Sequence, residues 1–315
     1  MIGLVVRRLA SLVPLLVIVS FALFGLVALV PGDAATTLAG GMNASTEDIE
    51  RIRTSLGLDQ PFLVQYGHWA WGVLHLDFGK SLQSGAPVAG ELLDRIPVTL
   101  SLVLCTLILV VPITLGLGIL GGLRAGRAED RVVLIGTSLG IAMPSFWVAL
   151  ILVSVFAVTA RWLPPAGYTP FTTDPSAWLQ HMVLPAVALA AFPLAVLVRQ
   201  LRGGLVETLY KPYVRTAWAK GGNSRQVVLG HALKSAAMPA VTVLGVQIAT
   251  LLGGSVVIEQ VFTVPGVGSY LLDAINTQDL PAIQAVALFY VIVNVVVSLL
   301  VDLTYGYLDP KVRAA

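Results

Sequence analysis

The sequence has few charged residues. Only 11% of its 315 residues are Asp, Glu, Lys or Arg, whereas 57% are hydrophobic, and the mean hydropathy is +0.87. Soluble globular domains carry about 25% charged residues, so this composition excludes an ordinary soluble protein and indicates an integral membrane protein. The net charge of +2 is not accompanied by a patch of mixed basic and aromatic residues. We therefore expect no nucleic-acid partner.

Residues that carry chemistry are also scarce. Cys105 is the only cysteine, which excludes an internal disulfide and a thiolate metal site. The four histidines lack the spacing of metal ligands, and no paired carboxylates or Ser/His/Asp set indicates catalysis. No G-x-x-x-x-G-K-[ST] motif is present to bind phosphates. We expect this chain to hydrolyse no ATP and to bind no cofactor and no metal.

Long apolar runs dominate instead. A spanning helix needs about 17 to 25 largely apolar residues. Six segments meet that requirement: Leu9–Val30, Val98–Gly122, Val132–Ala160, Met182–Val198, Ala236–Ile258 and Ala282–Val301. The sequence therefore predicts an all-α integral membrane protein with six transmembrane helices. The third segment is long enough that we expect a tilted helix or one that extends beyond the bilayer.

The first apolar run has two interpretations. Arg7 and Arg8 precede it, as basic residues precede the core of a signal peptide. The run is longer than such a core, however, and no clear small-x-small cleavage site follows it. We expect a retained transmembrane helix.

The distribution of Lys and Arg predicts the orientation, because cytoplasmic flanks retain positive charge during insertion. With six spans, the basic residues at both termini, after the second span and in Arg199 to Lys234 share one side. The opposite side holds fewer: Arg51, Arg53, Lys80, Arg95 and Arg161. Both termini are therefore predicted to be cytoplasmic, in an inner or plasma membrane.

The spans divide the chain unevenly. The expected parts are an N-terminal tip with the first helix at 1–30, an external helical segment at 31–94, a five-helix membrane domain at 95–306 with a cytoplasmic loop at 204–235, and a tail at 307–315. Ser45 and the acids after it predict the start of one external helix. Pro61 predicts the start of a second, Phe62 to Leu74. Trp69 and Trp71 near its end are expected to anchor the helix at the membrane surface, and contact with a ligand is the alternative.

Polar groups inside the predicted spans are few and neutral. Acids stand only near span ends, as Glu259 and Asp302. A proton- or sodium-coupled carrier generally needs a buried carboxylate, a histidine or another ion-coordinating group in mid-membrane, so we expect the energy to come from outside the chain. The candidates for a substrate path are Ser138, Ser145, Gln247, Thr250 and Asn294.

The most patterned polar stretch runs from Tyr213 to Pro239, between the fourth and fifth spans. Its charges are consistent with positive-inside topology alone, with the apolar residues lying on the membrane surface. The alternative is a short helix that ends near Gly221, a turn, and a second helix that docks on a partner. That second helix would present an apolar stripe flanked by charges: Val227, Val228, Ala232 and Leu233 between Lys220, Arg225 and Lys234.

This loop resembles a known signature. Arg215-Thr216-Ala217, three residues and then Gly221 are similar to the Glu-Ala-Ala-x-x-x-Gly signature of permease subunits in ATP-binding-cassette importers. His231 to Pro239 is similar to the dipeptide and oligopeptide branch. Further matches are Pro31-Gly32-Asp33, Leu56 to Pro61, Asp77 to Ser81, Pro265 to Gly268 and Tyr307 to Arg313. Their order and spacing cover nearly the whole chain and resemble the first of the two permeases in such systems.

Four residues depart from the pattern. Arg215 replaces the acid of the signature, Trp218 replaces a basic or small residue, and Gly222-Asn223 loosens the turn after Gly221. These departures concern the contacts of the loop rather than the fold.

The resemblance implies a type I importer permease fold and several partners. These are a second, similar permease, two ATPase subunits that use ATP and Mg²⁺, an external substrate-binding protein, membrane lipid and a short-peptide substrate. Nickel complexes, glutathione or another small solute are alternative substrates, and a secondary carrier or a channel is an alternative of a different class. The residues implied to couple the chain to the ATPases are Arg215, Thr216, Ala217, Lys220, Gly221, Arg225 and His231.

Overall fold

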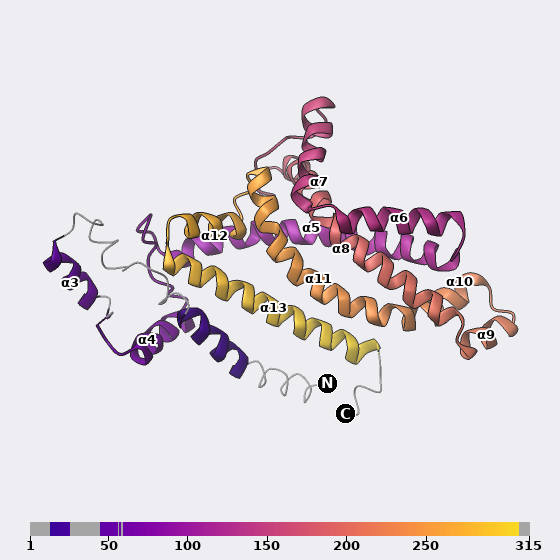
Figure 1. The fold of residues 1–315 in the computed structure, drawn as a ribbon, viewed down its shortest axis with the longest axis horizontal. Helices are drawn as coiled ribbons and strands as arrows, with labels where there is room; N and C mark the ends of the chain where they lie inside the picture. Colours follow the sequence, from indigo (N-terminus) through magenta and orange to yellow (C-terminus); the bar gives the residue numbers. More distant parts are fainter. Residues whose placement is uncertain (1–12, 26–44, 56, 58, 309–315) are drawn as a thin grey trace. The chain divides into compact units, whose positions relative to one another are not determined.

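The computed structural model describes residues 13–25, 45–55, 57 and 59–308 (Figure 1). The described part is helical, apart from loops and one isolated bridge between Lys80 and Pro87. After a short apolar helix, Val13–Gly25, come α3 (Thr46–Ser55), α4 (Phe62–Leu74), α5 (Val88–Leu123), α6 (Ala128–Ala142), α7 (Ser145–Leu152), the π-helical η2 (Val153–Thr159), α8 (Pro175–Leu209), α9 (Pro212–Ala219), α10 (Ser224–Val227), the π-helical η3 (Val228–Ala232), α11 (Leu233–Phe262), α12 (Val267–Asn276) and α13 (Leu280–Leu308).

Four stretches are long and apolar enough to cross a membrane: α5, α8, Ser224–Phe262 and Leu280–Val301. They include the predicted second, fourth, fifth and sixth spans. A fifth crossing is present if α6 and the α7–η2 segment together form one span. Three predicted features lie outside the described residues. They are both ends of the first span, the Pro31-Gly32-Asp33 motif, and residues 309–315 of the tail. The count of six therefore stays a prediction.

The predicted third span is not one continuous helix. α6 ends at Ala142, Met143 has an extended backbone with φ −89° and ψ 123°, and α7 begins after Pro144. Proline has no N–H to donate and disfavours a helical conformation in the residue before it. The two halves therefore meet at 103°. The expectation of a single tilted helix is wrong at this break.

The chain separates into two compact units. Of the described residues, unit 1 comprises 98–268 and 296–308, and unit 2 comprises those up to 97 together with 269–295. In unit 1, α11 runs along α8, and α6 and α7 also pack on α8 (Figure 1). Leu184, Leu189, Leu197 and Leu201 of α8 are at most 3% exposed, so α8 is the central helix of this unit.

Glycines allow the helices of unit 1 to approach closely. A Cβ placed on Gly122 of α5 would lie 2.8 Å from Leu205 of α8, and one on Gly140 of α6 would lie 3.0 Å from the Ala191 carbonyl oxygen. A Cβ on Gly204 would lie 2.7 Å from the backbone carbonyl oxygen of Ala236 in α11. Small residues at such crossings are the usual means of close helix packing in membranes.

A buried carboxylate, that of Glu259, lies at the end of unit 1 where α11 leads into α12. Glu259 is 0% exposed and accepts a hydrogen bond from the Thr99 hydroxyl at 2.7 Å. The same hydroxyl oxygen accepts the Val267 N–H at 2.8 Å. A Cβ on Gly266 would lie 2.5 Å from the Glu259 carboxyl group. The glycines of the Pro265 to Gly268 motif therefore make room for this acid.

Unit 2 contains the predicted external helices. α3 and α4 lie where the sequence placed them, and α4 has the predicted bounds. Trp69 packs with its ring centroid 5.5 Å from that of Phe24, whereas Trp71 is 67% exposed. In the loop before α5, the Ser81 hydroxyl donates to the buried Asp279. That contact anchors part of the Asp77 to Ser81 motif to the start of α13.

Candidate functional site

The segment between α8 and α11 folds as a helix, a turn and a second helix. Pro212 occupies the first turn of α9, where its missing N–H costs nothing. After α9 the chain turns at Gly221, whose φ of +82° is favourable only for glycine and a few polar residues. Asn223 then starts α10 with a capping box, in which its side chain accepts the Gln226 N–H at 2.9 Å. The predicted order of elements is confirmed.

One face of this segment is buried against the chain itself. Val214 of α9, Val227 of α10 and Ala232 of η3 form a cluster with Leu205 and Ala236, and each of the five is at most 1% exposed. Val228 is 3% exposed. The expectation that the apolar stripe of the second helix docks on a partner is therefore wrong, because α10 and η3 fold back onto α8 and α9 and use the stripe themselves.

The opposite face is open and cationic. Of the seven predicted coupling residues, the structure leaves six exposed, and Ala217 alone is half-buried, against the cluster. The exposed six are Arg215, Thr216, Lys220, Gly221, Arg225 and His231. Among the described residues, the ion pairs include none with Arg215, Lys220 or Arg225, and the nearby pair is Lys211 with Glu207 at 3.3 Å. These charges are therefore available to a partner.

Two aromatic residues complete the exposed face. Tyr213 and Trp218 are 45% and 41% exposed. Sequence reasoning treated Trp218 only as a departure from the signature and did not use Tyr213. The signal that identifies them is helical spacing, because Val214 and Ala217 on the buried side of α9 direct their neighbours outward. A short helix with cations and exposed rings on a buried apolar base is suited to docking in a groove of another protein.

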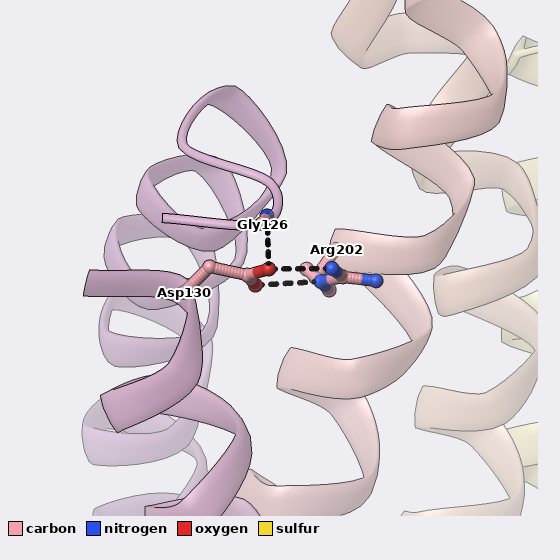
Figure 2. Close-up of polar contacts among 3 residues, drawn as sticks. All are labelled: Gly126, Asp130 and Arg202. Atoms are coloured by element: carbon pink, nitrogen blue, oxygen red, sulfur yellow. Dashed lines mark hydrogen bonds and ion pairs between the residues drawn. The ribbon is translucent and has the colours of Figure 1, made fainter. Parts of the chain in front are cut away.

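An ion pair lies within the last turns of α8, before α9. Arg202 donates from Nε to Oδ1 of Asp130 at 2.8 Å and from Nη2 to Oδ2 at 2.7 Å (Figure 2). The Gly126 N–H donates to Oδ2 at 2.8 Å. Asp130 is 2% exposed. Sequence reasoning did not identify this pair. An acid at the start of an apolar segment is a signal of function, but its arginine partner is 72 residues away on another helix.

The five candidates for a substrate path do not gather into one site. Ser138 donates to its own helix at Leu134 and accepts from Arg199 at 2.7 Å. Ser145 is the first residue of α7, and Gln247 is buried, with no hydrogen-bond partner for Oε1 among the described residues. Thr250 and Asn294 are exposed and each donates to a carbonyl of its own helix. The described hydrogen bonds join none of the five to another, and their role stays a prediction.

Two family profiles match the chain. Residues 1–103 match the N-terminal membrane component of binding-protein-dependent transport systems, and residues 113–314 match the inner membrane component of the same systems. The Escherichia coli (strain K12) dipeptide transport system permease protein DppB is 35% identical over 337 aligned positions, with 99% of each chain covered.

Two further relatives are more similar. A protein of Brucella abortus (strain 2308), whose name describes a peptide transport system permease, is 40% identical over 313 residues, with 99% of each chain covered. One of Sinorhizobium fredii, named as a peptide ABC transporter permease, is 39% identical over 309 residues, with 98% of each covered. A profile match over more than half of the chain and full-length relatives above 30% identity lead to one conclusion: the chain belongs to the inner membrane components of binding-protein-dependent transport systems and has their type I permease fold.

Proposed function

We propose that this chain is one of two membrane-spanning permeases in an ATP-driven importer and that it moves short peptides into the cytosol by alternating access. The observation that carries the proposal is the α9 segment, which presents cations and aromatic rings outward while its other face is buried in the same cluster as α8 and α11. Such a segment is held firmly enough to transmit a force from a docked subunit to the spans.

The partners follow from membership in the family. A second, similar permease would complete the translocation path, and two ATPase subunits would bind ATP and Mg²⁺ and dock on α9. An external binding protein would deliver the substrate. The excess of Lys and Arg in residues 199–234 supports a cytosolic position for this segment and for both termini, with the spans in an inner membrane.

The peptide substrate is inferred from relatives. The Escherichia coli and Brucella abortus proteins are named for dipeptide and peptide transport. A peptide is a zwitterion whose termini the binding protein can hold, so a permease with few charges in its spans is adequate for passage. Competition of labelled dipeptide uptake by unlabelled dipeptide, glutathione or a nickel complex identifies the substrate class, and we expect inhibition by the dipeptide.

The turn at Gly221 provides the test of the coupling role. Apart from its two chain neighbours, no heavy atom of the described residues lies within 4 Å of a Cβ placed there, so within this chain a substitution acts mainly through the left-handed backbone conformation. Gly221→Val is disfavoured by about 1–2 kcal/mol, about a 5- to 30-fold loss in the population of the native turn. Gly221→Asn is tolerated better, because asparagine adopts this conformation.

We expect Gly221→Val to reduce ATP-driven dipeptide uptake by about tenfold, with normal amounts of the chain in the membrane. Gly221→Asn should retain most of the uptake. Gly230→Ala, in the neighbouring π-helical segment with open space around it, is the matched control and should match the wild type. Undiminished uptake by Gly221→Val would argue against coupling through this turn.

A further inference from the structure

One carboxylate joins the turn between α5 and α6 to α8. Asp130 lies in the first helical turn of α6. It accepts a hydrogen bond from the N–H of Gly126, which lies between α5 and α6, and one from each of two N–H groups of the Arg202 guanidinium (Figure 2). The Arg202 side chain is 23% exposed and that of Asp130 is 2% exposed. A bidentate pair of this kind fixes both the distance and the orientation of its partners.

A second arginine repeats the contact two turns further along α6. Arg199 donates from Nε to the Thr137 hydroxyl at 3.2 Å and from Nη2 to the Ser138 hydroxyl at 2.7 Å. Arg199 and Arg202 are three residues apart and therefore lie on one face of α8. Together they fix α6 in register against α8.

α5 is included in the same assembly. A Cβ on Gly121 would lie 3.2 Å from Cγ of Arg202 and 3.4 Å from Oδ1 of Asp130, so this glycine leaves the room that the ion pair needs. A Cβ on Gly118 would lie 2.9 Å from Leu201, in the turn of α8 that carries the arginines. The ends of α5, α6 and α8 thus share one set of contacts.

This set of contacts leads directly to α9. Leu205, one turn beyond Arg202, is 0% exposed and packs in the cluster with Val214 of α9. From Gly126 through Asp130, Arg202 and Leu205 to Val214, each step is therefore a hydrogen bond, a covalent helix turn or a buried apolar contact. A displacement of α9 is therefore transmitted through continuous contacts to the turn between α5 and α6.

We propose that Asp130 and Arg202 are positioning residues of the importer, which make the ends of α5 and α6 move as one body with α8 and α9. The inference rests on the proposed coupling role of α9. Separation of the pair leaves two charges without their partners in a poorly solvated place, which is strongly unfavourable. The pair therefore stays closed throughout the transport cycle, and force from the ATPases reaches α5 and α6 as well as α8.

The adjacent ion pair is the matched control. Arg124 and Glu129 pair at 2.5 Å across the same turn, but their side chains are 47% and 42% exposed. Exposed pairs contribute little because water screens them, and the described side-chain hydrogen bonds and ion pairs of Arg124 and Glu129 join these two residues only to each other. Glu129→Gln should therefore leave the path from α9 intact, whereas Asp130→Asn removes the charge that pairs with Arg202.

The test uses the complete importer in proteoliposomes, with ATP hydrolysis and dipeptide uptake measured on the same vesicles. We expect Asp130→Asn to retain bound ATPase subunits and hydrolysis but to lower the peptide moved per ATP by about tenfold. Arg202→Lys, which keeps the charge and loses the fork, should have a smaller effect, and the exchange of both residues (Asp130→Arg with Arg202→Asp) should restore part of the ratio. Glu129→Gln should be unchanged. An unchanged ratio in Asp130→Asn overturns the inference, while absence of uptake by the wild type contradicts the proposed function instead.

A second measurement applies if Asp130→Asn fails to assemble. Spin labels on cysteines at Ala128 and Gly203, both exposed, with Cys105 replaced by alanine, report the distance between the start of α6 and the end of α8. The inference predicts the same distance in the nucleotide-free importer and in the importer trapped with ATP. A different distance in the two states shows that the pair opens and overturns the inference.

Discussion

The two ends of unit 1 are held by buried acids in different ways. Near α9, Asp130 pairs with the fork of Arg202 from another helix, and an apolar cluster lies beyond the pair. Near the turn after α11, Glu259 accepts a hydrogen bond from the neutral hydroxyl of Thr99, and its carboxyl group lies next to Gly266 and Gly268. The first end therefore has an ion pair in addition to closely packed helices, whereas at the second end glycines leave room for the acid beside a neutral hydroxyl. The ends of one helical unit therefore respond differently to changes in charge and in size.

The helices also pack closely near α9, and disruption of this packing should give the largest loss of stability among the variants considered. In Gly204→Leu the new side chain would start 2.7 Å from the backbone carbonyl oxygen of Ala236, which cannot move without displacing α11. We expect a loss of about 3 kcal/mol or more in stability, seen as little monodisperse protein after detergent extraction. Gly203→Leu is the adjacent control, with open space around its Cβ, and should behave as the wild type. Equal behaviour of the two variants would refute the close contact.

The hydroxyl of Thr99 gives an intermediate effect at the other end. Thr99→Val removes the donor to Glu259 and the acceptor for the Val267 N–H in a site that is 0% exposed. We expect a loss of about 1–3 kcal/mol, measured as a lower Tm of the purified chain. Thr106→Val is matched in helix and burial, but the hydrogen bond described for the Thr106 hydroxyl goes to the Leu102 carbonyl of its own helix. A similar fall in Tm for both variants would show that the contact with Glu259 is unimportant.

The smallest effect concerns the start of α8, where Asp174 caps the helix. The Ala177 N–H, then the hydroxyl and N–H of Ser176, hold the pKa of this carboxyl below its usual value. A lowered pKa in the folded state stabilises the protein above the unfolded pKa of about 3.9, and this stabilisation is lost as the pH falls through the folded pKa. The Tm difference between wild type and Asp174→Ala should therefore be positive at neutral pH and shrink on acidification.

Asp174→Asn serves as the control, since asparagine caps a helix without titrating. Its Tm difference from Asp174→Ala should not depend on the ionisation of residue 174. A wild-type advantage that is constant with pH would count against a contribution from the ionised carboxylate.

Local signals predicted the elements better than their contacts. Pro61 marked the start of α4 because proline fixes its own φ, and Gly221 marked the turn between α9 and α10 because glycine readily adopts a positive φ. The buried face of α10 and η3 was predicted wrongly, since its partner Leu205 lies on α8 and leaves no trace in the local pattern.

Longer-range features were harder to foresee. Asp130 and Arg202 are 72 residues apart, so only the fold brings them together. Pro144 was visible in the sequence, but membrane helices tolerate proline where neighbours satisfy the freed backbone. The sequence alone therefore did not distinguish a tolerated proline from the observed break after Ala142.

Photo-crosslinking from α9 tests the central claim most directly. A photoreactive amino acid replaces Thr216, on the exposed face of α9, and the importer is irradiated in native membranes and analysed by mass spectrometry. The account predicts a crosslink to a P-loop ATPase from position 216 and none from a matched probe at Val158, a 63% exposed residue of η2. Recovery of the intact complex with no ATPase crosslinked from position 216 would contradict the docking of ATPases on α9.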